Sequence, residues 1–149
     1  MLSDERQILN LIHRYAELQD AADFEAVAAL FRDAAFRIAN GPTAHGFDAV
    51  LALKRRHDRV HEDGTLRTKH VTTNTFLELA PDGQRARARS YFVVYQATTR
   101  LPLQCIAAGR YHDAFERPDG AWRFTDRLIQ VDLIGDMSEH TRDNPLAST

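Results

Sequence analysis

The chain has 149 residues, 44% of them hydrophobic and 27% charged, which is ordinary for one globular domain with a sizeable core. Its formal net charge of −2 at pH 7 gives no electrostatic argument for a nucleic-acid partner. The single cysteine, Cys105, excludes a disulfide within one chain. Together with the lack of an apolar leader or membrane-length apolar run, it favours a cytoplasmic protein with no membrane partner.

The first part of the chain predicts three helices and one short strand. Residues 3–23 carry apolar side chains at three- and four-residue steps, which is typical of an amphipathic helix. Asp23 can cap a second helix over residues 24–33. Residues 34–40 alternate like a strand and end at a turn signal, and a third helix is expected from residue 46 to near Gly64.

After this helix the hydrophobic period changes from 3.6 to 2, which predicts four strands. They are expected over residues 67–79, 85–97, 103–116 and 121–134. Short turns join consecutive strands, so neighbours should be antiparallel. The fold class is therefore α+β: a cone-shaped α+β barrel in which three N-terminal helices pack on a curved, mainly antiparallel sheet and enclose a pocket. Residues 1–136 form this single domain, and residues 137–149 form a polar C-terminal tail.

The strand over residues 67–79 combines polar and apolar side chains in an unusual way. Strict alternation places His70, Thr72, Asn74 and Phe76 on one face, a mixture that suits the wall of a ligand pocket. In the last strand, alternation places Phe124 on one face with Asp126, and Arg127 on the other with Thr125 and Ile129. Apolar residues occupy both faces of the later strands, which favours a homodimer or homotrimer that covers the outer face.

Several short motifs together resemble the nuclear transport factor 2-like superfamily, and within it the SnoaL-like group. They are "RYAELQDAADFEAVAALFRDAAF", "GFDAV", "KHVTTN", "GRYHDAFER" and "GAWRFTDR", and they cover about residues 5–135. This group includes scytalone dehydratase, bile acid 7α-dehydratase, a hexachlorocyclohexane dehydrochlorinase and the non-catalytic β subunits of ring-hydroxylating dioxygenases. The resemblance implies the fold more strongly than the chemistry, since one fold hosts many functions.

The resemblance implies a set of catalytic residues. By position, His70 is similar to the family's base and Asp20 to the aspartate that orients it. Tyr15 and Arg127 match a tyrosine on the first helix and a pocket arginine on the last strand. Tyr15 and Asp20 are five residues apart, a rotation of roughly 140° on an ideal helix, so both reach the pocket only if the helix bends or loosens.

Further positions are expected to bind substrate: Tyr111 and Asp113 by resemblance, and Asn74 and Phe76 by their place on the strand. Each assignment has a plainer alternative. His70 can be a hydrogen-bonded core residue, Arg127 and Asp113 can be a structural ion pair, and Asn74 can satisfy the backbone. The sequence has no histidine between Val71 and His112, which weighs against a scytalone-type reaction.

The expected function is that of a cofactor-independent lyase, dehydratase-like, or of an isomerase. His70, oriented by Asp20, would act as general base on a small, hydrophobic, cyclic substrate. The alternative is a non-catalytic protein that binds a small molecule or serves as a partner subunit. No metal is expected, because the helical pair His57 and His61 lacks the zincin glutamate and an evident third ligand.

Overall fold

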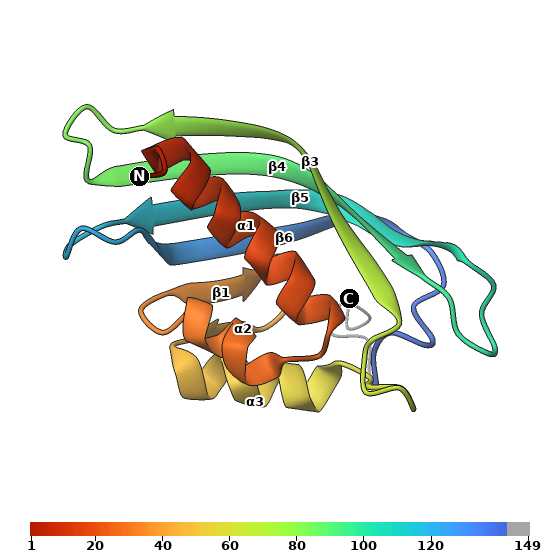
Figure 1. Ribbon diagram of the computed structural model, residues 1–149. Coiled ribbons are helices and arrows are strands. Elements are labelled where there is room, and N and C mark those ends of the chain that lie inside the picture. The colour runs from red at the N-terminus through yellow and green to blue at the C-terminus, as the bar shows by residue number, and fades with distance from the viewer. Residues whose placement is uncertain (143–149) are drawn as a thin grey trace.

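This computed structural model describes residues 1–142, which form three helices and one six-stranded sheet joined by loops (Figure 1). The helices are α1 (Asp4–Asp20), α2 (Phe24–Leu30) and α3 (Phe47–His57). The strands are β1 (Ala35–Ile38), β2 (Thr43–His45), β3 (Thr68–Leu79), β4 (Arg85–Gln96), β5 (Gln104–Glu116) and β6 (Arg123–Ile134). Their order agrees with the prediction, with the short β2 as an addition.

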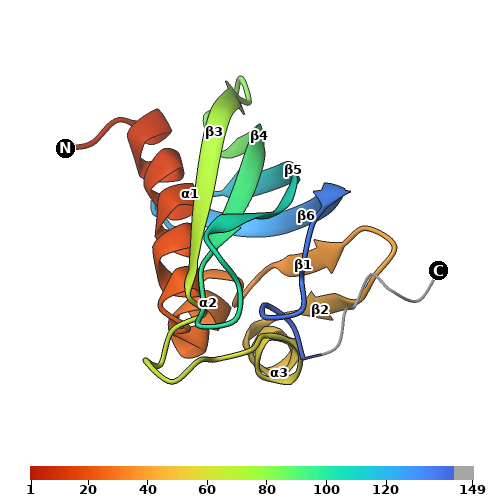
Figure 2. The same cartoon turned by 90° about the vertical axis from the view of Figure 1, so that its right-hand side faces the viewer.

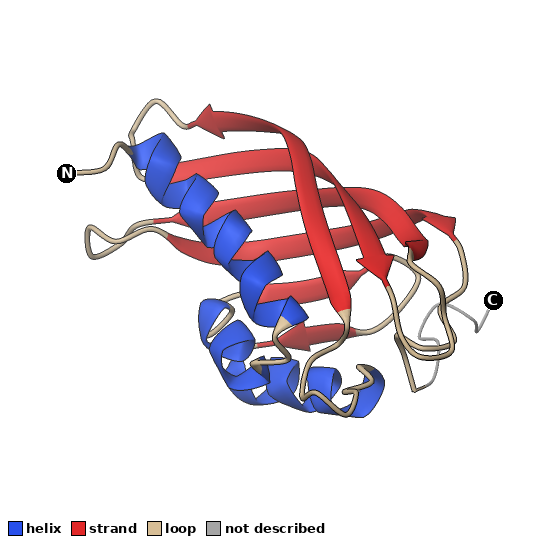
Figure 3. Ribbon diagram, turned by 45° about the vertical axis from the view of Figure 1, so that its right-hand side comes forward, coloured by secondary structure: helices blue, strands red, loops and turns tan. Residues whose placement is uncertain are grey.

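The sheet is open, curved and almost wholly antiparallel. Its strand order is β2-β1-β6-β5-β4-β3, so β2 and β3 are the two edges. Among the six strands of the described residues, only β1 and β6 run parallel, and they pair although most of the sheet lies between them in sequence. Figure 3 shows the long strands bending around one side of the molecule. The predicted α+β class, with three helices on a curved and mainly antiparallel sheet, is confirmed.

The helices cover one face of the sheet, and the core lies between them. In Figure 2, α1 stands beside β3 while α3 lies at the end of the sheet that carries β1 and β2. Ile8 and Ile12, one turn apart on α1, are fully buried. Burial of each side chain stabilises the fold by about 1.5–3 kcal/mol. Asp23 caps α2 by accepting from the Ala26 N–H, as the sequence predicts. None of the described helices is long and apolar enough to span a membrane.

The third helix ends at His57, so the prediction that it continues to near Gly64 is wrong. Asp58 leaves the helix in an extended conformation and forms an isolated bridge with Thr141. Its buried carboxylate accepts from Gln19 on α1 at 2.8 Å. These contacts with two other segments hold Asp58 out of the helix. His61, which the prediction placed on the helix, therefore lies beyond its end.

A β-bulge in β3 overturns the prediction that four alternating residues share one face. The pairing with β4 shifts between Thr73 and Phe76, and Asn74 adopts a left-handed conformation with φ of 39°. The extra residue reverses the alternation beyond it. His70 and Thr72 point to the helices, whereas Asn74 is exposed and Phe76 is 52% exposed with the Arg89 guanidinium 4.1 Å from its ring centroid.

A second bulge lies in β6 and corrects the predicted separation of Phe124 from Arg127. The register with β5 shifts where Ala114 pairs with Asp126 and Phe115 pairs with Phe124. β6 therefore has one extra residue, without a partner on β5, and the alternation of its side chains reverses at that point. Phe124 and Arg127 are both fully buried on the inner face.

The outer face of the sheet carries exposed apolar side chains. Val71, Tyr91, Tyr95 and Leu133 are between 40% and 69% exposed. The expected homodimer or homotrimer would cover such a surface, and it stays a prediction.

Because the bulge in β3 depends on a left-handed residue, we expect Asn74→Val to destabilise the protein by about 1–2 kcal/mol. A β-branched side chain is strained at this φ, whereas Asn74→Gly is not and provides the matched control. Urea unfolding of the two variants measures the difference. Equal stability of the two would contradict the role assigned to the bulge.

Candidate active site

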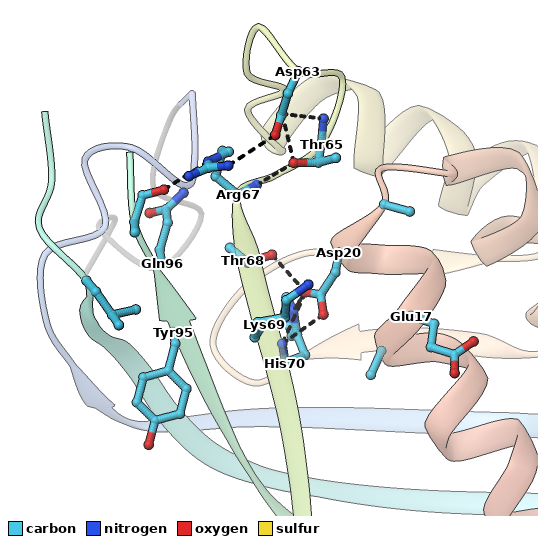
Figure 4. A pocket seen from close by; sticks show the side chains of 14 residues that line it. Glu17, Asp20, Asp63, Thr65, Arg67, Thr68, Lys69, His70, Tyr95 and Gln96 are labelled. Carbon is cyan, nitrogen blue, oxygen red and sulfur yellow. Dashed lines mark hydrogen bonds and ion pairs between the residues drawn. The ribbon is translucent and has the colours of Figure 1, made fainter. Parts of the chain in front are cut away.

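The centre of the candidate site is an aspartate–histidine pair between the last residue of α1 and the edge strand β3 (Figure 4). His70 Nδ1 lies 2.6 Å from Asp20 Oδ1, and the two side chains are 6% and 12% exposed. The backbone N–H of His70 donates to the same carboxylate, at 3.0 and 3.1 Å to its two oxygens. Thr68 Oγ1 adds a further hydrogen bond of 2.8 Å to Oδ1.

These contacts determine the ionisation of Asp20 and the tautomer that a neutral His70 adopts. Burial alone would raise the pKa of Asp20, but the hydrogen bonds from His70 and Thr68 outweigh it and hold the pKa below its ordinary value. The ionised carboxylate is purely an acceptor, so Nδ1 of a neutral His70 must carry its hydrogen. The remaining ring nitrogen, Nε2, then has the free lone pair that a general base requires.

Tyr15 reaches the same imidazole from the interior. Its ring centroid is 6.5 Å from that of His70 in an edge-on arrangement, and its side chain is buried. Tyr15 and Asp20 thus both approach His70 although they are five residues apart on α1, and Asp20 does so from the last position of the helix.

Behind Tyr15 lies a buried ion pair. Arg127 and Asp113 are directly paired residues of β6 and β5, and both side chains are 0% exposed. Two hydrogen bonds of 2.8 and 2.9 Å join Nε and Nη2 of the arginine to the two carboxylate oxygens. Its third nitrogen, Nη1, is buried and has no hydrogen-bond partner among residues 1–142. A buried donor without a partner is costly, and it is suited to a ligand oxygen.

Two tyrosines enclose this arginine. The guanidinium carbon is 3.8 Å from the ring centroid of Tyr111 and 4.4 Å from that of Tyr15. Burial would lower the pKa of Arg127, but the charge and hydrogen bonds of Asp113 raise it above its ordinary value. Burial raises the pKa of both tyrosine hydroxyls. Near pH 7 the hydroxyls are therefore hydrogen-bond donors and not bases.

Six of the eight predicted site residues are contiguous in the structure. They form a set that we call the interior cluster: Tyr15, Asp20, His70, Tyr111, Asp113 and Arg127. Asn74 and Phe76 lie outside it, because the β3 bulge turns them to the other face.

Lys54 of α3 also belongs to this region, although the sequence prediction omitted it. Its ammonium donates to the Tyr15 hydroxyl at 3.3 Å and lies 3.7 Å from Asp58, and its side chain is 7% exposed. Burial lowers its pKa, against the opposing charge of Asp58. A signal was present, since Lys54 stands four residues after the buried Val50 and so continues the apolar stripe of the helix.

His140 is the second residue that the prediction omitted. Its ring centroid is 6.1 Å from that of His70, and the residue is 8% exposed. It belongs to residues 137–142 of the segment predicted as a polar tail, and residues 143–149 of that tail lie outside the described part. Burial lowers the pKa of His140 to about 4, with Asp58 opposing this shift and His70 and Lys54 adding to it. Nothing in the local sequence signals this contact.

A groove along the edge of the sheet, which we call the edge groove, borders the pair. It has a volume of about 640 Å³ and lies among the end of α1, the loop before β3, the start of β3 and the end of β4. Asp20, His70 and Gln96 are part of its wall, and Tyr95 lies at its outer side (Figure 4). Its size is in the range of small-molecule sites.

No group of three His, Cys, Asp or Glu side chains within residues 1–142 is arranged to hold a metal ion. His61 Nε2 lies 2.7 Å from the carbonyl oxygen of Glu139, and it does not share a helix with His57. The two histidines are thus not at the helical spacing on which a metal pair would depend.

We expect Asp113→Leu to reduce the free energy of unfolding by about 3–5 kcal/mol, because it leaves the Arg127 charge buried and unpaired. The double variant Asp113→Leu/Arg127→Met removes both charges and should lose less. Urea unfolding of the single and double variants measures this. A double variant that is less stable than the single one would show that the pair is not the dominant contribution.

The pKa of His140 predicts acid sensitivity. The unfolded chain takes up a proton near pH 6.5 and the folded one only near pH 4, so stability falls as the pH decreases through this window. The total loss is on the order of 3 kcal/mol. We expect His140→Gln to lose correspondingly less than the wild type between pH 7 and pH 4 in urea unfolding. Parallel pH profiles for the two proteins would contradict a neutral, buried His140.

Solved structures share this fold. An NTF2-like protein with a cystatin-like fold from Novosphingobium aromaticivorans is 23% identical, with a TM-score of 0.72 over 87% of this chain and 82% of that one. A candidate scytalone dehydratase from the same organism is 24% identical, with a TM-score of 0.71 over 89% and 87% of the two chains.

The β subunit of a candidate aromatic-ring-hydroxylating dioxygenase, also from that organism, is 17% identical, with a TM-score of 0.71 over 91% and 94%. At these identities the likeness shows the fold alone. No curated protein matches the chain significantly. The model of the SnoaL-like domain family matches residues 1–128, and the chain therefore belongs to the SnoaL-like domain family.

Proposed function

We propose that the protein is a cofactor-independent lyase, dehydratase-like, or an isomerase that acts on a small, hydrophobic, cyclic substrate. The observation that carries this proposal is the 2.6 Å contact of His70 Nδ1 with Asp20, at the wall of the edge groove. It orients the imidazole, leaves Nε2 as the proton acceptor, and places a carboxylate where it stabilises the imidazolium.

The proposed reaction begins with proton removal next to an activating carbonyl. His70 Nε2 takes the proton from carbon, and the electron pair moves onto the carbonyl oxygen. In a dehydration the pair then returns to expel a hydroxyl group from the neighbouring carbon, and His70 gives its proton to that group, so that water leaves. In an isomerisation His70 returns the proton to a different carbon, and the double bond moves.

Other members of the interior cluster suit the oxygen that becomes negative. The free Nη1 of Arg127 and the protonated hydroxyls of Tyr15 and Tyr111 are donors in a buried, aromatic environment. Donors fixed in such a place stabilise developing negative charge more than water does. Asp113 holds the arginine in position. The aromatic rings around it favour a cyclic substrate.

One observation favours a second candidate, a protein that binds a small molecule, or serves as a partner subunit, without catalysis. The His70 side chain is only 6% exposed, and its backbone N–H shares the Asp20 carboxylate. The same contact therefore has a structural purpose, since it satisfies a donor on an edge strand.

Hydrogen exchange distinguishes the two candidates without knowledge of the natural substrate. The probe is 1-tetralone, a bicyclic ketone with acidic hydrogens next to its carbonyl, in D₂O, with deuterium incorporation followed by ¹H NMR. We expect the wild type to accelerate exchange over buffer, and His70→Asn to lower the rate by about 10²- to 10⁴-fold. His13→Asn, on the exposed side of α1, is the matched control and should retain the wild-type rate.

Binding of 1-tetralone with no exchange above buffer would support the non-catalytic candidate. Equal exchange in the wild type and in His70→Asn would contradict the assignment of the base. Circular dichroism of each variant confirms that a lost rate is not a lost fold.

A further inference from the structure

Hydrogen bonds and an ion pair hold Glu139 and His140, which follow β6, beside the His70–Asp20 pair. Gln96 of β4 and the His61 ring both contact the carbonyl oxygen of Glu139, at 3.0 and 2.7 Å. Arg59 forms an ion pair of 2.8 Å with the Glu139 side chain, and its N–H donates to the carbonyl of His140. Several separate contacts thus hold His140 against the site from outside the sheet.

The fixed imidazole of His140 has an unused polar atom. Its Nδ1 is buried and has no hydrogen-bond partner among residues 1–142. Three charged side chains, Asp20, Lys54 and Asp58, influence this ring together with His70, and burial keeps the ring neutral above about pH 4. A neutral imidazole carries one N–H and one lone pair, so its Nδ1 can hydrogen-bond to a ligand oxygen.

A second unused atom lies in the same part of the interior. Gln96 is 0% exposed, and its Nε2 donates to two backbone carbonyls, those of Leu66 and Glu139, both at 3.0 Å. Two carbonyl partners fix the amide orientation, so the remaining atom, Oε1, is an acceptor. Oε1 is buried and also has no partner within residues 1–142. The Glu139 carbonyl belongs to the peptide bond that leads into His140, so the two unused atoms belong to side chains that this peptide unit connects.

We infer that Gln96 and His140 form a subsite for a hydroxyl group of the ligand, next to His70. A hydroxyl is the group that satisfies both atoms at once: its O–H donates to Gln96 Oε1 while its oxygen accepts from His140 Nδ1. A carbonyl or ether oxygen only accepts, and it would leave the glutamine oxygen unpaired. An apolar ring atom would leave both unpaired, at a cost for each.

The position of this subsite suits a hydroxylated substrate. The two imidazole centroids are 6.1 Å apart, so a ligand hydroxyl bound at His140 would lie next to the His70 ring. Gln96 and His70 are both in the wall of the edge groove, so the proposed entry of the ligand is from this groove. The inference deepens the proposed function and depends on it for the role of His70.

The test compares two probes that differ by one hydroxyl, 4-hydroxy-1-tetralone and 1-tetralone. We expect the wild type to bind the hydroxylated probe about 3- to 10-fold more tightly, the worth of one net hydrogen bond. His140→Phe should abolish this preference, and His140→Gln, which keeps a hydrogen-bonding group, should retain part of it. His13→Phe on the exposed side of α1 is the matched control and should preserve it.

Ring ¹⁵N NMR of the wild type provides a second measurement that needs no variant. The hydroxylated probe should move the His140 Nδ1 resonance, and 1-tetralone should move it less. If His140→Phe does not fold, His140→Gln and the NMR shifts decide the question.

Equal affinity for the two probes would overturn the subsite and would indicate that water satisfies both atoms. A preference that persists in both His140 variants would overturn it as well. In either case, exchange of 1-tetralone that still depends on His70 leaves the proposed function standing. If neither probe binds and no exchange occurs, both proposals fail together.

Discussion

The carboxylate of Asp20 is the contact on which the arrangement of the site depends. Asp20 is the last residue of α1. Its carboxylate accepts hydrogen bonds from the Thr68 hydroxyl and from both the backbone N–H and the ring of His70. The backbone carbonyl of Asp20 accepts from the backbone N–H of Leu66. Through these bonds the helix is joined to the exposed edge of the sheet, where strand donors would otherwise be unpaired. The same bonds set the tautomer of His70. One carboxylate therefore determines how the edge is closed and which nitrogen is available for chemistry.

Periodicity was sufficient for the elements but not for the orientation of every side chain. The change from period 3.6 to period 2 located the helices and the long strands to within a few residues, apart from the end of α3. The bulges in β3 and β6 that reorient predicted site residues leave no such mark in the sequence. One extra residue in β3 turned Phe76 away from the site, and one in β6 brought Arg127 to the same face as Phe124. A bulge reverses the faces without altering composition, so strict alternation fails beyond it.

Some site residues can be recognised from the sequence around them, and others only from contacts with distant parts of the chain. Lys54 could have been identified locally, since it occupies a position on the apolar stripe of α3 where a charge needs buried partners. His140 could not, because its segment is polar and without period, and its neighbours come from β3, β4 and the end of α3. The approach of Asp20 to His70 spans 50 residues and was anticipated only through the family resemblance. Long-range polar contacts thus set the limit of sequence reasoning here.

The charges around His70 give a reason for a neutral second histidine. The interior brings together three carboxylates, those of Asp20, Asp58 and Asp113, and two cations, Lys54 and Arg127. A second charged imidazole 6.1 Å from His70 would add to the positive charge of Lys54 and Arg127 in this region. Burial keeps His140 neutral and so limits this positive charge. The hydrogen bond to Asp20 orients the ring of His70 and not that of His140.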